Sequence, residues 1–462
     1  MRATPHAVIA SLSTVLLHST PAWSQQQPPP SSPPLVLAQP EAPAAPPATI
    51  TLQDALDRAK QNDLQFQSAF ADAESAREDR VQARSTLLPA ISFTTQYLGN
   101  SPNGVNPNGR FVSLDGVKMY RAWAVARQDL SANVLMRTPL LKARAVEAAT
   151  QAKLEVAQRG LLVTVTRSYY ALVVAQRRYA TTQTAAQQAG RFFDQTQQQQ
   201  RLGQVARSDV VKAEIQYQQQ QQAFRDAQVA MENARLGLAV LLSPTFDENF
   251  TVVDDLVAAP VLPPFADVRT MAGRSNPDVR AADEALRAAG HDVQAAKNAF
   301  LPSIAVDAVY GIEANEFALH SEVAAQPEFG VLPNLGYFLT VNLSVPVWDW
   351  GSLRSKLHQS ENRERLARVT LTQTQRQLMS NLYSMYNEAV GARSAVDNLQ
   401  HVADLAAESL RLTALRYQAG ESTALEVVDA QNTFVQARNT IDDAQVRYRV
   451  ALAELQTLTG PF

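Results

Sequence analysis

The sequence predicts a mixed, mostly helical fold in which long helix pairs carry four membrane-spanning β-strands per chain. Three observations lead to this prediction. The chain of 462 residues repeats one plan twice, each copy holds a long proline-free stretch with helical periodicity, and each copy also holds short segments that alternate apolar and polar residues.

The first 24 residues, 1–24, have the form of a secretory signal peptide. The basic Arg2 precedes the mostly apolar run 7–17, and the small residues Ala22 and Ser24 offer a cleavage site. An apolar but disordered tail is the alternative interpretation. The region that follows, 25–49, is rich in proline, alanine and glutamine and is predicted to be a Pro-rich disordered linker, because it cannot bury a core.

Residues 50–244 and 245–462 are predicted to be two structural repeats, each with a helix, a β-hairpin and a long helix pair. The motif Leu-Pro-Ala-Ile at 88–91 recurs as Leu-Pro-Ser-Ile at 301–304, an offset of 213 positions. Apolar positions in the second copy follow alternating steps of four and three, the 3.5-residue period of supercoiled helices, and the pattern recurs in register in the first copy.

The helix pairs are predicted from two proline-free stretches, 140–243 and 347–460. Each stretch can hold two long helices, with the turn between them at Gly203 in the first copy and at Gly420 in the second. A helix over 142–201 would be on the order of 90 Å long, far longer than a compact domain needs. A soluble coiled-coil rod would explain the helices equally well.

Short alternating segments predict β-hairpins near residues 88–131 and 301–347. Apolar side chains occupy every second position, with few exceptions, in the segments 91–97, 304–312 and 337–345. Each segment has about the nine to eleven residues that a tilted strand needs to cross a bilayer, with apolar groups toward lipid and polar groups toward a wet lumen. Hairpins of an ordinary soluble sheet packed on the helices are the alternative.

The fourth segment, 120–130, is predicted mainly from the repeat, because Trp123 and Val125 fall on the same face as Arg121 and Arg127. No apolar run of about 18 residues follows the signal segment, so a membrane crossing would require a closed β-barrel. Four strands cannot close a barrel alone. Several copies of the chain are therefore expected to share one.

Composition argues against several classes of function. The 41 basic and 44 acidic side chains give a net charge of −3, so no strong field would attract nucleic acid. The chain has no cysteine, and its six histidines lack the spacing of metal ligands. No phosphate-binding loop or nucleophile motif is visible. The sequence therefore predicts no enzyme, no cofactor, no metal and no nucleic-acid partner.

The duplicated order of elements behind a signal peptide resembles the TolC-like outer-membrane efflux protein family across nearly all of residues 50–462. Its local marks are Leu-Pro at the start of strands, the segment 343–349 at the end of one, and Arg-Tyr-Gln-Ala-Gly at 416–420 followed by Glu-Val-Val-Asp at 426–429. No single one of these marks is specific to the family. Their occurrence together, in this order and in both copies of the repeat, is specific.

The resemblance implies a homotrimer in the cell outer membrane, with its helical part in the periplasm. The three chains would share a β-barrel of about twelve strands, four from each chain, continued by an α-barrel of about twelve helices in coiled-coil pairs. A periplasmic adaptor, or membrane fusion protein, and an inner-membrane transporter would dock at the periplasmic end. The chain would then be the outer-membrane channel of a tripartite efflux pump and contact outer-membrane lipid.

The same resemblance assigns roles at the entrance of the channel, where Gly203 and Gly420 form the helix-tip turns. Glu426 and Asp429 match acidic positions of the family, and three copies of each would form a ring that favours cations. The alternative is that these acids only complement the dipole at a helix start.

A latch at the entrance is implied for Asp209 and Tyr417, which match residues that hold the tip shut through a hydrogen bond between neighbouring helices. Ser422 departs from the family pattern, in which an arginine would add a salt bridge to this latch. The closed state is therefore expected to be held differently here.

Two rival functions stay open. Type I protein secretion uses the same kind of channel as efflux of small molecules, and the residues do not choose between them. A soluble periplasmic coiled-coil scaffold is the rival from another class, because it would account for the helices without the membrane strands.

Overall fold

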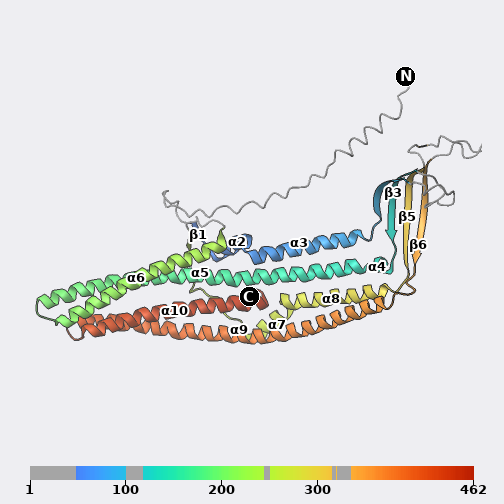
Figure 1. The fold of residues 1–462 in the computed structure, drawn as a ribbon. Coiled ribbons are helices and arrows are strands. Elements are labelled where there is room, and N and C mark those ends of the chain that lie inside the picture. The colour runs from blue at the N-terminus through green and yellow to red at the C-terminus, as the bar shows by residue number, and fades with distance from the viewer. Residues whose placement is uncertain (1–47, 100–117, 244–249, 315–318, 320–333, 462) are drawn as a thin grey trace, which may run out of the picture.

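The structure, a computed structural model, describes residues 48–99, 118–243, 250–314, 319 and 334–461. The predicted signal peptide, 1–24, and the predicted linker up to residue 47 lie outside the described residues. The described chain is an elongated bundle of helices with a small β-sheet at one end and two helix turns at the other (Figure 1).

The elements follow one order in each half of the described chain, apart from the short helix α4, which only the first half contains. The first half contains β1 (Ala48–Ile50), α2 (Leu52–Asn62), α3 (Leu64–Ser85), β2 (Ala90–Gly99), β3 (Lys118–Asp129), α4 (Ala132–Leu135), α5 (Thr138–Arg201) and α6 (Arg207–Leu242). The second half contains β4 (Phe250–Val252), α7 (Phe265–Ser275), α8 (Pro277–Asn298), β5 (Ser303–Ala314), β6 (Leu335–Ser344), α9 (Ser352–Gln418) and α10 (Ala424–Thr459).

Two very long helices, α5 and α9, run most of the length of the molecule (Figure 1). They contain 64 and 67 residues, so each is about 100 Å long at 1.5 Å per residue. Each packs along its shorter partner, α6 or α10, and the two halves meet where α5 contacts α8 and α10. The seam residues of α9 are mostly alanine and leucine, small enough for close helix packing, with buried members Leu378, Leu382, Ala389, Ala392, Ala403 and Ala406.

The four long strands form one antiparallel sheet in the order β2-β3-β5-β6. Because paired residues point to the same side, the register places the apolar positions of all four strands on one face. That face carries the exposed side chains Ile91, Phe93, Tyr97, Ile304, Tyr310, Tyr337, Leu339, Val341 and Leu343. The opposite face carries Arg121, Arg127, Asp307 and Glu313. The one-sided sheet expected from the alternation is therefore present.

The strand that alternates poorly in the sequence, β3, has its faces defined by this register. Its apolar face is made by Tyr120 and the small residues Ala122, Ala124 and Ala126, which pair with the apolar positions of β2 and β5. Trp123 lies on the polar face, where its ring packs edge-on against Phe338 with centroids 6.1 Å apart. The sequence signal was weak because the apolar face of β3 consists mostly of small alanines, whereas the larger apolar residues Trp123 and Val125 lie on the same face as the arginines.

A second, two-stranded sheet near the middle of the bundle was not predicted. In it β1 pairs with β4 in parallel, Ala48 to Phe250 and Ile50 to Val252. The predicted linker boundary at residue 49 is therefore wrong, because Ala48 and Thr49 already belong to a strand. Three residues are too few to show periodicity, and the partner strand lies about 200 positions away in the sequence.

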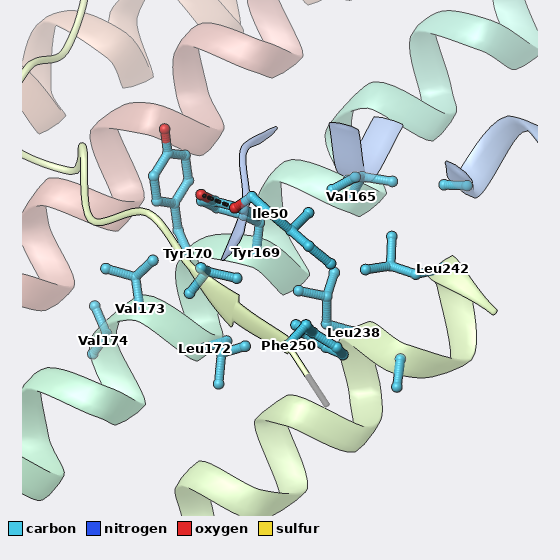
Figure 2. Packing of buried hydrophobic residues seen from close by; sticks show 14 of the residues in the cluster. Ile50, Val165, Tyr169, Tyr170, Leu172, Val173, Val174, Leu238, Leu242 and Phe250 are labelled. Atoms are coloured by element: carbon cyan, nitrogen blue, oxygen red, sulfur yellow. Dashed lines mark hydrogen bonds between the residues drawn. The ribbon is translucent and has the colours of Figure 1, made fainter. Parts of the chain in front are cut away.

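The main hydrophobic core lies under this small sheet, between α5 and α6 (Figure 2). Tyr169 and Tyr170 of α5 are fully buried there, with rings in edge-to-face contact at 5.4 Å. The Tyr169 hydroxyl donates to the Val253 carbonyl at 2.8 Å, with the Ile50 carbonyl at 3.1 Å. Burial raises the pKa of Tyr169 to about 12, so this phenol stays protonated and keeps donating at all ordinary pH values.

The two halves are also joined by charged groups on α5 and α10. The Arg177 guanidinium donates to Asp442 at 2.8 Å and, through its other two nitrogens, to Asp254 at 2.6 and 2.7 Å. Asp442 is buried in this contact. Nearby, Arg178 pairs with Asp443. Breaking a partly buried ion pair of this kind is costly, so the pair favours the meeting of these two helix faces.

Candidate functional site

The helix tip is formed by two equivalent turns, one after α5 and one after α9 (Figure 1). Gly203 has φ +73° and Gly420 has φ +77°, conformations that a residue with a Cβ adopts only at a cost. In each turn a backbone N–H bonds six-to-one to the last helical turn, from Gln204 to Gln199 and from Glu421 to Arg416. This is how glycine ends a helix, and it explains why both long helices stop where the sequence predicts.

Tyr417, one of the two predicted latch residues, is buried in a small apolar cluster at the tip. Its ring lies 5.1 Å from the ring of Phe192 on α5. Its hydroxyl donates to the Gln199 side chain at 3.0 Å, with the Thr196 hydroxyl at 3.5 Å. The phenol therefore joins α9 to α5, across the two halves of the chain.

The other predicted latch residue, Asp209, lies in the first turn of α6. Among the described residues of this one chain, its carboxylate has no hydrogen bond or ion pair. Its pairing with Tyr417 therefore stays a prediction. The hydrogen bond from the Tyr417 hydroxyl to Gln199 forms without Asp209. Neither Gln199 nor Thr196 stands out in the sequence, because both sit in a long glutamine- and threonine-rich helix surface.

Glu426 makes a capping box at the start of α10. Thr423 is the N-cap, and its side chain accepts from the Glu426 N–H while Glu426 accepts from the Thr423 N–H and hydroxyl at 3.3 and 3.1 Å. Ser422, which stands where the family pattern has arginine, donates to Glu426 at 3.0 Å. These bonds, first the one from the Thr423 backbone, hold the pKa of Glu426 below its usual value, so the exposed side chain stays charged.

Asp429 lies one turn further along α10 and is exposed. The structure therefore places both predicted acidic residues at the tip with exposed side chains. It also gives Glu426 a local role that matches the alternative interpretation, in which the acid supports the helix start. The two roles are compatible, because a capping carboxylate keeps its charge.

The polar face of the four-stranded sheet forms a second group of charged side chains. Arg121 donates to Glu313 at 2.9 Å and to Gln96 at 3.2 Å, linking three neighbouring strands, and its guanidinium lies 5.2 Å from the Trp123 ring. Arg127 faces Asp307 at 3.6 Å. The sequence showed the arginines but not their partners, because each pair joins residues about 180 to 190 positions apart.

Metal-ligand groups and membrane-spanning helices are both absent from the described part of the chain. It contains no group of three or more histidine, aspartate or glutamate side chains placed to hold a metal ion. Over those same residues, no helix combines the length and the apolar character needed to cross a membrane.

Comparison with known proteins agrees with this geometry. The chain matches the family described as outer membrane efflux protein over residues 55–243 and 269–461, which takes in both halves. It is 23% identical over 413 residues to outer membrane protein TolC of Vibrio cholerae, covering 88% of this chain and 90% of that protein. It is 24% identical to the alkaline protease secretion protein AprF of Pseudomonas aeruginosa, covering 88% and 84%.

Among solved structures, the CmeC outer membrane channel of Campylobacter jejuni superposes with a TM-score of 0.72 at 16% identity, covering 88% of this chain and 85% of that one. This likeness confirms the channel fold predicted from the sequence. Since the family match spans well over half of the chain and both of its halves, the chain belongs to the outer membrane efflux protein family.

Proposed function

We propose that the chain is one of three identical subunits of an outer-membrane channel that exports small molecules as part of a tripartite pump. The observation that carries the proposal is the four-stranded sheet with one exposed apolar face and one charged face. Its outer strands, β2 and β6, each have one neighbour within the described chain. Unpaired edges cannot persist in lipid, so neighbouring copies must complete a closed barrel.

In this assembly the apolar face of the sheet meets lipid and the charged face lines the lumen. The long helices continue the wall into the periplasm, and the tip turns at Gly203 and Gly420 form the entrance. A periplasmic adaptor and an inner-membrane transporter would act at that end, and the transporter would supply the energy. The soluble scaffold alternative leaves the exposed apolar face of the sheet unexplained.

The entrance is proposed to be selective because Glu426 and Asp429 repeat by symmetry around a narrow opening, where their fields add. Support comes from their exposure at the tip and from the lowered pKa of Glu426. The capping role of Glu426 must be separated from this charge effect in any test.

Two double variants make that separation. Glu426→Gln with Asp429→Asn removes both charges but keeps an acceptor for the capping box, since glutamine serves at that position. Glu426→Ala with Asp429→Ala removes the charge and the cap. In planar bilayers we expect both variants to lose cation preference, with only the alanine variant also losing stability. If the glutamine–asparagine variant keeps the ion selectivity of the unsubstituted channel, the acidic ring is refuted, and capping is the only role that remains for Glu426.

Protein secretion is the second candidate, and one observation favours keeping it: the similarity to AprF, a secretion protein, extends over 88% of this chain. Export of dyes or antibiotics by cells carrying the chain with a small-molecule transporter supports efflux. Release of a polypeptide substrate, with no effect on small-molecule accumulation, would support secretion instead.

A further inference from the structure

Two residues other than glycine have a left-handed backbone conformation in the described chain: Arg137, with φ +55°, and Trp350, with φ +56°. They are 213 positions apart, which is the repeat offset that relates the Leu-Pro motifs at 88–89 and 301–302. Both stand at a junction where a strand of the sheet gives way to a long helix, α5 or α9. A disfavoured conformation kept at two equivalent places points to a role at those places.

The second junction is held firmly in this conformation. The Asp349 carboxylate accepts hydrogen bonds from the Gly351 N–H at 3.0 Å and the Leu353 N–H at 2.6 Å, and the Asp349 carbonyl accepts from the Ser352 N–H. The result is a tight turn that directs its aromatic side chains outward. Trp350 is 90% exposed and Trp348 76% exposed, and the two indoles touch edge-on with centroids 5.6 Å apart.

The first junction makes a similar outward step with different residues. Leu135 and Met136 are exposed, and Arg137 follows them as the N-cap of α5. The two junctions leave the sheet at one level, because Asp129 near the end of β3 pairs with Ala305, and Ser344 at the end of β6 pairs with Ser303. Both junctions therefore lie at the end of the sheet that faces the helices, with the strand β5 between β3 and β6 (Figure 1).

We propose that these junctions bind phospholipid at the periplasmic surface of the outer membrane. The occupant is argued from continuity: the apolar row of β6 ends in Leu343, and the exposed Val345, Val347 and Trp348 follow directly after the strand. Indole rings favour the boundary between headgroups and acyl chains, where their apolar body and N–H group are both satisfied.

Charge favours the anionic phospholipids over neutral ones. Arg137 at the first junction and Arg354 and Lys356 in the first turns of α9 are exposed and basic. Cationic side chains next to interfacial tryptophans bind lipid phosphates and draw anionic headgroups to the surface. The backbone strain at Arg137 and Trp350 is then maintained because it aims these groups at the headgroups.

The test uses the trimer reconstituted in phosphatidylcholine vesicles with and without phosphatidylglycerol. In a Trp123→Phe background, indole fluorescence reports mainly on Trp348 and Trp350, and lipids brominated near the headgroup or deep in the chain report their depth. We expect strong quenching by the shallow bromine and weak quenching by the deep one, with loss of the signal in Trp348→Phe/Trp350→Phe. An absence of quenching by either lipid would show that a neighbouring subunit or another protein covers the indoles, and would overturn the proposal.

A second measurement addresses the basic residues. Replacing Arg137, Arg354 and Lys356 with glutamine is expected to abolish the upward shift of thermal midpoint that phosphatidylglycerol gives to the unsubstituted trimer, while the midpoint in pure phosphatidylcholine stays unchanged. An equal shift in both proteins would contradict the anionic preference. The inference rests on membrane insertion and not on cargo or entrance, so it can fail while the export function stands.

Discussion

Replacing Gly311 with alanine tests the pairing of the two central strands of the sheet. Gly311 in β5 lies between Trp123 of β3 and Gly336 of β6. A Cβ added to Gly311 would lie 2.1 Å from the Ala122 carbonyl oxygen and 2.8 Å from the Trp123 Cα. Both atoms belong to the backbone, so no side-chain rotation relieves the contact.

The size of the effect follows from this geometry. A carbon and a carbonyl oxygen need about 3.3 Å, so the strands must separate locally on the order of 1 Å. Overpacking of this kind costs about 1–3 kcal/mol, and weakening one neighbouring ladder hydrogen bond adds about 1 kcal/mol. We expect Gly311→Ala to lower the free energy of unfolding by about 2–4 kcal/mol per subunit, roughly 30-fold to 1000-fold in the equilibrium constant.

The assay is the fraction of folded trimer against urea concentration, read on gels from the different migration of folded and unfolded barrels. Gly336→Ala is the matched control, because it lies in the neighbouring strand and an added Cβ there meets no atom within 4 Å. The control should be neutral or stabilise by up to about 1 kcal/mol, since alanine restricts the unfolded chain. Equal midpoints for the two variants would refute the assigned register between β3 and β5.

Three further predictions concern the helices and the tip. Tyr417→Phe keeps the ring packed but removes a hydrogen bond worth about 0.5–1.5 kcal/mol, so single-channel recordings should show more frequent opening; an unchanged open probability would mean that the bond does not hold the tip. Asp442→Asn leaves Arg177 with one fewer carboxylate in a buried contact and should cost about 1–3 kcal/mol in chemical denaturation, less than a fully orphaned charge; a wild-type midpoint would contradict this. The pKa of Glu426 lies below its ordinary value of 4.5, so its contribution is complete above pH 4.5 and is lost only as the pH falls through the lower folded value. In an Asp429→Asn background, cation preference should therefore persist down to pH 4.5, and a loss above that pH would disprove the assignment.

Local rules were enough to find the long helices and the three well-patterned strands. The absence of proline from 140–243 and 347–460 and the glycines at the tip fix where α5 and α9 end, because helix termination depends on the backbone of a few consecutive residues. Alternation with period two found β2, β5 and β6 for the same reason. These are properties of neighbours along the chain.

Contacts between distant segments were beyond such rules. The pairing of β1 with β4, the ion pair of Arg121 with Glu313, and the hydrogen bond from Tyr417 to Gln199 each join residues about 190 to 220 positions apart. The apolar face of β3 became visible only when the register placed its alanines beside the tyrosines and leucines of other strands.

The sequence by itself therefore determined the kind, order and approximate limits of the main elements and the residues at the helix tip. The tertiary structure decided which charged and aromatic groups meet, and on which face of the sheet they lie. The physical reason is that backbone conformation responds to near neighbours, whereas a side-chain partner is set by how whole helices and strands pack.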